Sequence, residues 1–254
     1  MNEDRLLVFD LSGEYGHFRK FNTTTSPLTY SIPTRMALTG VLGAVLGVER
    51  ESAPGRFPEG VVPVQEMFSS ETCGLAVQLL APIRKVSIGF NLIDTGKEAA
   101  SFFNIRKGGR TQIEFELLKN PSFRVLVRLD DASLFDALAQ KLLDRSHHFT
   151  PYLGLSQFTA TIQNVTVTQA VRKVSVSSFV QIHSAVNLSL IREDQPIEFD
   201  QEAHYNVETM PIELSRDRIV LRYGEILVDT KGGAVRVNTG EWFETSQFGN
   251  LLFL

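Results

Sequence analysis

The sequence has a single cysteine, Cys73, among 254 residues and therefore cannot form an intramolecular disulfide. Such low cysteine usage is typical of a reducing compartment. No apolar run approaches the roughly 20 residues that a membrane-spanning helix needs. The first residues, MNEDRLLVFDL, are acidic where a secretory signal peptide is basic. We therefore expect a soluble, cytoplasmic protein that does not contact a membrane.

Motifs of catalysis and of metal binding are also scarce. Cys73 and the five histidines show no metal-ligand spacing, so we expect neither a metal ion nor another cofactor. The tripeptide 94–96 matches the aspartic-protease motif but lacks its flanking apolar pattern and a convincing second copy. A P-loop is excluded because the glycine required five positions before Gly96 is missing.

Charge is distributed unevenly along the chain. The net charge of −4 by itself argues against a nucleic-acid partner. However, residues 95–128 hold seven basic and three acidic side chains, whereas residues 193–244 hold five basic and twelve acidic ones. The basic segment suits contact with phosphates. The acidic third suits either a protein-facing surface or one that is only solvated.

The most informative stretch is residues 13–43, GEYGHFRKFNTTTSPLTYSIPTRMALTGVLG. Turn glycines let a backbone approach a ligand closely, and basic and hydroxyl side chains suit phosphate oxygens. A helix that begins at Pro33 adds free N–H groups, and nearby aromatic side chains can stack on bases. The stretch therefore predicts a cradle for single-stranded nucleic acid, formed by His17, Arg19, Lys20, the hydroxyl-rich loop Thr23–Ser26, Tyr30 and Arg35.

The hydrophobic periodicity predicts an α+β fold in the order β-α-β-β-α-β, as in a ferredoxin-like unit. Asn120-Pro121-Ser122 is a turn signature, and Asp130–Ser133 is a helix cap. The expected elements are strands at 5–11, 75–92 with a bend at Pro82, 111–118, 123–129 and 159–167, and helices at 33–47 and from 131 to about 145. The connection 49–72 looks irregular, and the segment 94–110 is expected to project as a hairpin.

Two regions are expected. Residues 1–170 would form the ferredoxin-like domain, with the insertion at about 94–110. Residues 171–254 are β-rich and would form either a smaller appendage or extra strands lying on the first unit.

Three stretches resemble CRISPR-associated protein family five, the RAMP-superfamily subunit of type I Cascade effector complexes, with the type I-B branch most similar. They are FDLSGEYGHFRKFNTTTSPLTYSIPTRMALTGVLGAVLG (9–47), PYLGLSQFTA (151–160) and MPIELSRDRIVLRYGEILV (210–228). The resemblance implies a subunit that binds the 5′ handle of the crRNA. Type I-C members of the family also cleave the precursor RNA, but their Tyr and Lys-His pattern is not found in this sequence, so we expect a non-catalytic subunit. It also implies contacts with the Cascade backbone subunit and large subunit, and with target DNA indirectly through the complex.

Carried onto this chain, the resemblance implies two sets of RNA-binding residues. The segment 94–110 would be the thumb hairpin that lifts a nucleotide at the junction of handle and guide. The handle would meet His17, Arg19, Lys20, Asn22, Thr23, Thr24, Thr25, Tyr30 and Arg35, and the thumb would place Arg106, Lys107 and Arg110 along the RNA.

Each of these residues has a plainer interpretation. Arg19 and Lys20 would be surface charges, Tyr30 would pack beneath the loop, and Arg35 would form a salt bridge with a carboxylate. Residues 107–110 would be an ordinary hairpin tip. The glycines at 40, 43 and 47 favour close helix packing over RNA contact.

Two rival functions differ in class. A metal-independent, crRNA-processing endoribonuclease would use a general base and a stabiliser of the phosphorane. His17, Lys20, Tyr30 and the pair His147-His148 are its candidates, but the pair more simply caps a helix end. A metabolic enzyme or small-molecule sensor would instead have an enclosed pocket with converging polar groups.

Overall fold

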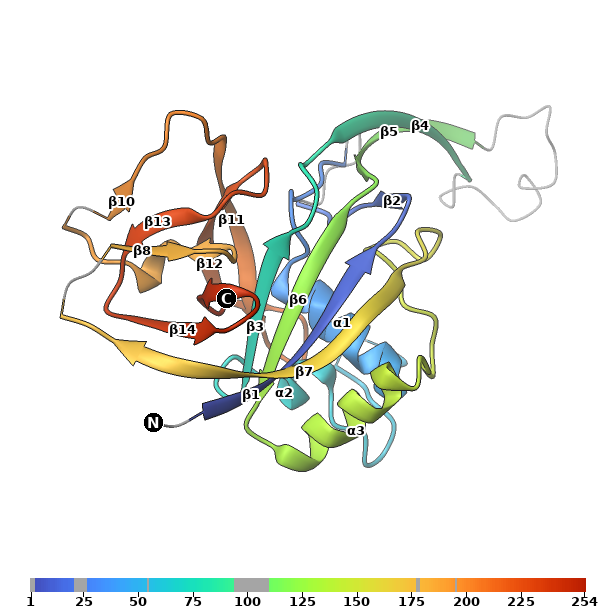
Figure 1. Ribbon diagram of the computed structural model, residues 1–254. Helices are drawn as coiled ribbons and strands as arrows, with labels where there is room; N and C mark the ends of the chain where they lie inside the picture. Colours follow the sequence, from blue (N-terminus) through green and yellow to red (C-terminus); the bar gives the residue numbers. More distant parts are fainter. Residues whose placement is uncertain (1–2, 21–26, 54, 94–109, 177–178, 195) are drawn as a thin grey trace.

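The computed structural model describes residues 3–20, 27–53, 55–93, 110–176, 179–194 and 196–254. It is a strand-rich α+β fold with few helices (Figure 1). In chain order the first part contains β1 (Glu3–Ser12), β2 (Tyr15–Gly16), α1 (Arg35–Leu46), α2 (Val64–Met67), β3 (Cys73–Leu79), β4 (Lys85–Ile93), β5 (Arg110–Lys119), β6 (Ser122–Leu129), α3 (Ala132–Leu143) and β7 (Thr161–Val174).

The remaining elements are short, except for one long hairpin of two strands. They are β8 (Phe179–Ile182), β9 (Val186–Asn187), the 3₁₀ turn η3 (Leu188–Leu190), β10 (Ile197–Glu198), β11 (Tyr205–Leu214), β12 (Val220–Asp229), β13 (Val235–Asn238), β14 (Glu241–Thr245) and β15 (Gly249–Leu251).

A nine-stranded sheet forms the body of the molecule, in the order β10-β13-β8-β15-β14-β7-β1-β6-β3. Within it, β1 lies antiparallel to both β6 and β7, and β3 lies antiparallel to β6. The predicted element order is present as β1, α1, β3, β6, α3 and β7, with β4 and β5 inserted between β3 and β6. Helices α1 and α3 cover one face of these strands (Figure 1).

Both faces of β1 are buried, since its side chains alternate between two hydrophobic clusters. Leu7 and Phe9 pack in the main core with Leu42 of α1. Leu6 and Val8 point to the opposite face, where C-terminal residues cover them. This explains why RLLVFDL reads as a continuous apolar run rather than an alternating one.

The two long helices lie where they were expected, because capping residues mark their ends. Thr34 caps α1 by accepting from the Ala37 amide at 3.2 Å, and Gly47 ends the helix in the left-handed conformation at φ 85°. Asp131 caps α3 by accepting from the amides of Ser133 at 2.8 Å and Leu134 at 3.1 Å. Within the connection 49–72, the short helix α2 was not predicted, since one turn carries almost no periodic signal.

Several of the C-terminal strands extend the first sheet. β7 runs through residue 170, where a domain boundary was expected; it pairs with β1 over residues 161–171 and with β14 over residues 170–174. Strands β14, β15, β8, β13 and β10 then continue the sheet beyond β7 (Figure 1). These five strands are added to the first unit, one of the two arrangements expected from the sequence, whereas β11, β12 and β9 form a separate three-stranded sheet.

The hairpin β4–β5 projects from the body beside β2 (Figure 1). Its two strands pair in register from Lys85 opposite Leu118 to Ile93 opposite Arg110. Arg110 is exposed at the start of β5. The predicted thumb tip, with Arg106 and Lys107, lies outside the described residues, so the RNA contacts of these residues stay predictions.

The three glycines of α1 have three different surroundings. A Cβ at Gly43 would clash with the Val64 side chain of α2, and Gly47 has the positive φ already noted and lies against His148. A Cβ at Gly40 would meet nothing within 4 Å. The packing interpretation therefore holds at Gly43, whereas Gly40 leaves a bare stretch of helix surface.

A matched pair of alanine substitutions tests this difference. Gly40→Ala should raise the free energy of unfolding by up to about 1 kcal/mol, because alanine is the better helix former and has room. Gly43→Ala should lower it, because Val64 must move to admit the methyl group. Urea unfolding measures both; a loss of stability in Gly40→Ala equal to that in Gly43→Ala would contradict the open space at Gly40.

Candidate nucleic-acid interface

The first loop is held by pairing between its two arms. Arg19 forms an isolated antiparallel bridge with Thr29, and the Tyr30 amide donates to the Phe18 carbonyl at 2.8 Å. The tip between the arms, residues 21–26, lies outside the described residues, and with it the predicted RNA contacts of Asn22, Thr23, Thr24 and Thr25.

His17 and Tyr30 do not reach the surface, which corrects their predicted RNA contacts. His17 is 1% exposed, with its Nδ1 at 2.8 Å from the Glu116 carbonyl, and burial lowers the pKa of the imidazole. Tyr30 is 3% exposed; burial first, and then the charge of Glu208, raise the pKa of its phenol. Both rings pack beneath the loop, as the plainer interpretation of Tyr30 had it.

Arg35 is also buried, at 1% exposure, so its predicted place on the RNA surface is wrong in this fold. Its Nη2 donates to the carbonyls of Phe68 at 3.0 Å, Ser69 at 3.0 Å and Cys73 at 2.6 Å. Burial lowers the pKa of the guanidinium, but arginine remains charged at neutral pH. Its partners are backbone carbonyls rather than the expected carboxylate, so Arg35 organises the turn 68–73 from inside the core.

Lys20 is tied to a buried carboxylate. Its Nζ lies 2.5 Å from Glu208 of β11, whose side chain is 6% exposed. Lys85 reaches the same carboxylate at 3.7 Å, and the Ser31 amide donates to it at 2.7 Å. Burial alone would raise the pKa of Glu208, but Lys20, the Ser31 amide and Lys85 together hold it below its usual value. Glu208 therefore joins the first loop, β4 and β11.

The segment 151–160, the second stretch of the resemblance, packs directly on the first loop. The His17 amide donates to the Leu153 carbonyl at 2.9 Å. Gly154 has φ 87°, and a Cβ there would collide with the His17 carbonyl, so only glycine permits this approach. Two stretches more than 100 residues apart in sequence therefore form one surface.

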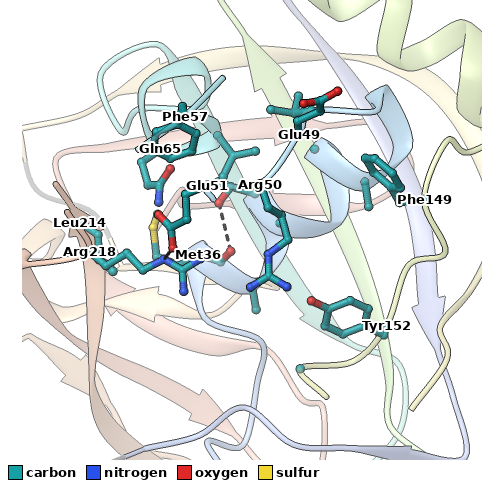
Figure 2. Close-up of a pocket in the computed structure, with 18 of the residues that line it drawn as sticks. Met36, Glu49, Arg50, Glu51, Phe57, Gln65, Phe149, Tyr152, Leu214 and Arg218 are labelled. Carbon is teal, nitrogen blue, oxygen red and sulfur yellow. Dashed lines mark hydrogen bonds and ion pairs between the residues drawn. The ribbon is translucent and has the colours of Figure 1, made fainter. Parts of the chain in front are cut away.

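A cavity of about 890 Å³ lies where all three resembling stretches meet. Its floor is the glycine-containing side of α1, with Met36, Gly40 and Gly43. The walls come from Arg19 of the first loop, residues 48–51 and Phe57, residues 149–154 and the tip of the β11–β12 hairpin. The lining is mostly apolar but includes charged side chains, and Figure 2 shows Arg50 in the middle of the labelled side chains.

The hairpin tip closes one end of this cavity through contacts with residues 51–57. Arg218 pairs with Glu51 at 2.6 Å, and Arg216 lies over the Phe57 ring at 5.2 Å from its centroid. A Cβ at Gly55 would collide with Asp217, so these segments touch closely. Arg218 itself has φ 60°, as expected at the tip of a tight turn.

Sequence reasoning found Arg19 but missed most of the groups around it. Arg50, Phe57, Phe149, Tyr152 and Arg218 also line the cavity. Arg50 and Phe57 lay in the connection that was described only as irregular. Tyr152 and Arg218 lie within the second and third resembling stretches, so the convergence of those stretches was the signal that could have identified them.

The described residues show neither a metal centre nor a membrane span. Among them, no three His, Cys, Asp or Glu side chains come together as metal ligands would. No helix in the same part of the chain is both long and apolar enough to cross a bilayer.

Proteins of the CRISPR systems share this fold. One chain of a CRISPR RNA-guided surveillance complex is similar with a TM-score of 0.55 and 16% identity, covering 92% of this chain and 91% of that one. A CRISPR protein from Archaeoglobus fulgidus is similar with a TM-score of 0.53 and 10% identity, covering 98% and 99%. At such identities the likeness establishes the fold alone.

The sequence itself establishes the family. The family described as CRISPR-associated protein (Cas_Cas5) matches residues 6–229, which is most of the chain. The protein therefore belongs to the Cas5 family of CRISPR-associated proteins, as the resemblance in its sequence indicated. No curated protein matches the sequence.

Replacing Glu208 tests its role as the anchor of the first loop. Glu208→Gln should lower the free energy of unfolding at pH 7 by about 3 kcal/mol, because it leaves Lys20 without its buried partner. The folded pKa of Glu208 is below the ordinary value of 4.5, so its contribution is complete above pH 4.5 and disappears as the pH falls through the folded value.

The difference between wild type and Glu208→Gln should therefore shrink as the pH falls below 4.5, which urea unfolding over a pH series measures. Glu198→Gln is the matched control, since Glu198 pairs with Arg236 at the surface and should change stability little. A difference that stayed constant down to pH 3 would show that Glu208 does not act through its charge.

Proposed function

We propose that the protein is a non-catalytic subunit of a type I CRISPR Cascade effector complex, closest to type I-B, and binds the 5′ handle of the crRNA. In this role it would start assembly of the complex on the guide RNA in the cytoplasm. Its partners would be the crRNA, the backbone subunit and the large subunit, with target DNA reached through the complex. Family membership supports the setting, and the cavity on α1 carries the proposal for this chain.

The strand arrangement supports a ferredoxin-like RAMP domain. The four strands of the unit are, in chain order, β1, β3, β6 and β7, and they lie in the sheet in the order β7-β1-β6-β3. Its first strand, β1, therefore lies between the fourth, β7, and the third, β6, and both helices cover the same face. Such a unit supplies a rigid base for the loops above it. The first loop, residues 48–51 with Phe57, and residues 149–154 all extend from this base toward the cavity.

The chemistry of the cavity suits unpaired RNA. Single-stranded RNA is bound by basic groups that follow the phosphates and by aromatic side chains that stack on splayed bases. Arg19 and Arg50 supply positive charge, and Phe149 and Tyr152 supply aromatic faces at one end of the cavity (Figure 2). Gly40 adds bare helix surface on which a sugar or base can lie without a side chain in the way.

The positions of the candidate nuclease residues support a non-catalytic role. A general base must reach the proton that it removes. His17 is buried against Glu116, Tyr30 is buried, and Lys20 is paired with Glu208. His148 lies against the end of α1 at Gly47. These contacts give a structural task to His17, Tyr30, Lys20 and His148, whereas His147 is exposed.

Removing the two cavity arginines from the full-length protein should weaken binding of the repeat-derived 5′ handle RNA. Arg19→Ala combined with Arg50→Ala removes two phosphate contacts. It should therefore reduce the slope of log K against log salt by about 1.4, at roughly 0.7 per contact for single strands. Fluorescence anisotropy at several salt concentrations measures this slope.

Two further variants make the titration specific to the cavity. Gly40→Leu places a side chain where a Cβ meets nothing within 4 Å, so it should weaken binding without loss of the fold. Arg236 lies far along the sheet on β13, where it pairs with Glu198. Arg236→Ala is therefore the control and should leave the slope unchanged. If the double arginine variant and Gly40→Leu both kept the slope and the affinity of the wild type, this placement of the RNA would be contradicted.

A cleavage assay tests the absence of catalysis. Purified protein incubated in excess over its precursor repeat RNA in EDTA should give no product within a single turnover. If product appeared and His147→Ala with His148→Ala abolished it, the endoribonuclease alternative would replace the proposal.

A further inference from the structure

Two residues that line one end of the cavity, Glu51 and Gln65, each have a buried oxygen atom that accepts no hydrogen bond from the described residues. Glu51 uses Oε1 to accept from Arg218 at 2.6 Å, and its side chain is only 11% exposed. Among the described residues, no donor reaches the other carboxylate oxygen, Oε2, or the amide oxygen of Gln65, although both atoms are buried. Buried acceptors without partners are costly, so their presence in a cavity wall needs an explanation.

The same end offers flat apolar surface. Figure 2 shows Gln65 and Glu51 at the end of the cavity where Phe57, Met36 and Arg218 lie, with Phe149 and Tyr152 at the opposite end. Phe57 is held by Arg216, whose guanidinium lies over its ring. An aromatic ring beside unpaired acceptors suits a planar ligand that carries N–H donors on one edge.

We infer that this end of the cavity is a base-selective pocket that receives a guanine of the bound RNA; the inference rests on the proposed RNA-binding function and names what the site reads. Glu51 and Gln65 are its specificity-determining residues. The Watson–Crick edge of guanine presents the 2-amino group, N1–H and the O6 acceptor in that order. Both oxygens are buried in the unbound protein, so the two side chains turn toward the cavity when the base enters. Glu51 Oε2 then accepts from the 2-amino group, Gln65 Oε1 accepts from N1–H, and the Gln65 amide group donates to O6.

The other bases fit this set of groups less well. Adenine and cytosine each offer one amino group beside a ring nitrogen that accepts, and uracil offers one N–H between two carbonyl oxygens. Each would leave at least one buried acceptor unpaired, and a site built to hydrogen-bond its ligand discriminates strongly against a ligand that lacks the donor. The charge of Arg50, in the middle of the cavity, is placed to attract the phosphate that follows.

The probes for the test are 3′-labelled heptauridylates with a single central substitution: guanine, inosine, adenine, cytosine or uracil. Fluorescence anisotropy with full-length wild-type protein should give the tightest binding for guanine, about tenfold over uracil. Inosine keeps N1–H but lacks the 2-amino group and should fall between them. Equal affinity for guanine and uracil would overturn the inference and leave the proposed function standing.

Variants assign the selectivity to the two residues. Glu51→Ala and Gln65→Leu should each reduce the guanine-to-uracil ratio toward one. Glu51→Ala also releases Arg218, so its affinity for the all-uracil RNA should not fall. Glu49→Ala is the matched control, since Glu49 is an exposed acid of the same cavity, and it should keep the wild-type ratio.

The outcomes separate the two proposals. A ratio that persisted in both Glu51→Ala and Gln65→Leu would place guanine selection elsewhere and overturn the pocket. If wild-type protein bound none of the heptamers but did bind the handle RNA, a free guanine pocket would again be excluded. Failure to bind any RNA at all would instead overturn the proposed function.

Discussion

The buried carboxylate of Glu208 is the contact on which the shape of the candidate site depends. It holds Lys20 of the first loop, Lys85 of β4 and the Ser31 amide ahead of α1. A carboxylate with so little solvent must be satisfied by its neighbours, so the loop, the hairpin and β11 are fixed in relation to one another. Arg19 directly precedes Lys20, which is bound to Glu208, and therefore lines the cavity from a fixed position.

The fold was largely predictable because its signals are local. Thr34, Gly47 and Asp131 mark helix ends by hydrogen bonds within a few residues, and Pro121 follows Asn120 in a turn with φ 48° at the asparagine. The continuation of the sheet through β7 was left open, because a strand that pairs on both sides carries no sequence mark of where its second partner begins.

The site was predictable only in part, because charge in a sequence does not show depth in a structure. Arg35 and Arg19 belong to the same stretch, yet one is surrounded by carbonyl oxygens in the core and the other lines the cavity. Neither the buried carbonyls of the turn 68–73 nor the acceptors at Glu51 and Gln65 leave a pattern in the sequence. The carbonyls surround Arg35 at the start of α1, and the acceptors lie near the tip of the β11–β12 hairpin. At each place, segments that are distant in the sequence meet.

The continuous nine-stranded sheet has a mechanical consequence. Because β7 is hydrogen-bonded to β1 on one side and to β14 on the other, the strands above the helices share one sheet with β14, β15, β8, β13 and β10. The edge strand β10 is thus connected through paired strands to the part of the sheet that α1 and α3 cover. A partner protein bound at this far edge would therefore be connected to the base of the cavity by the backbone hydrogen bonds of the sheet.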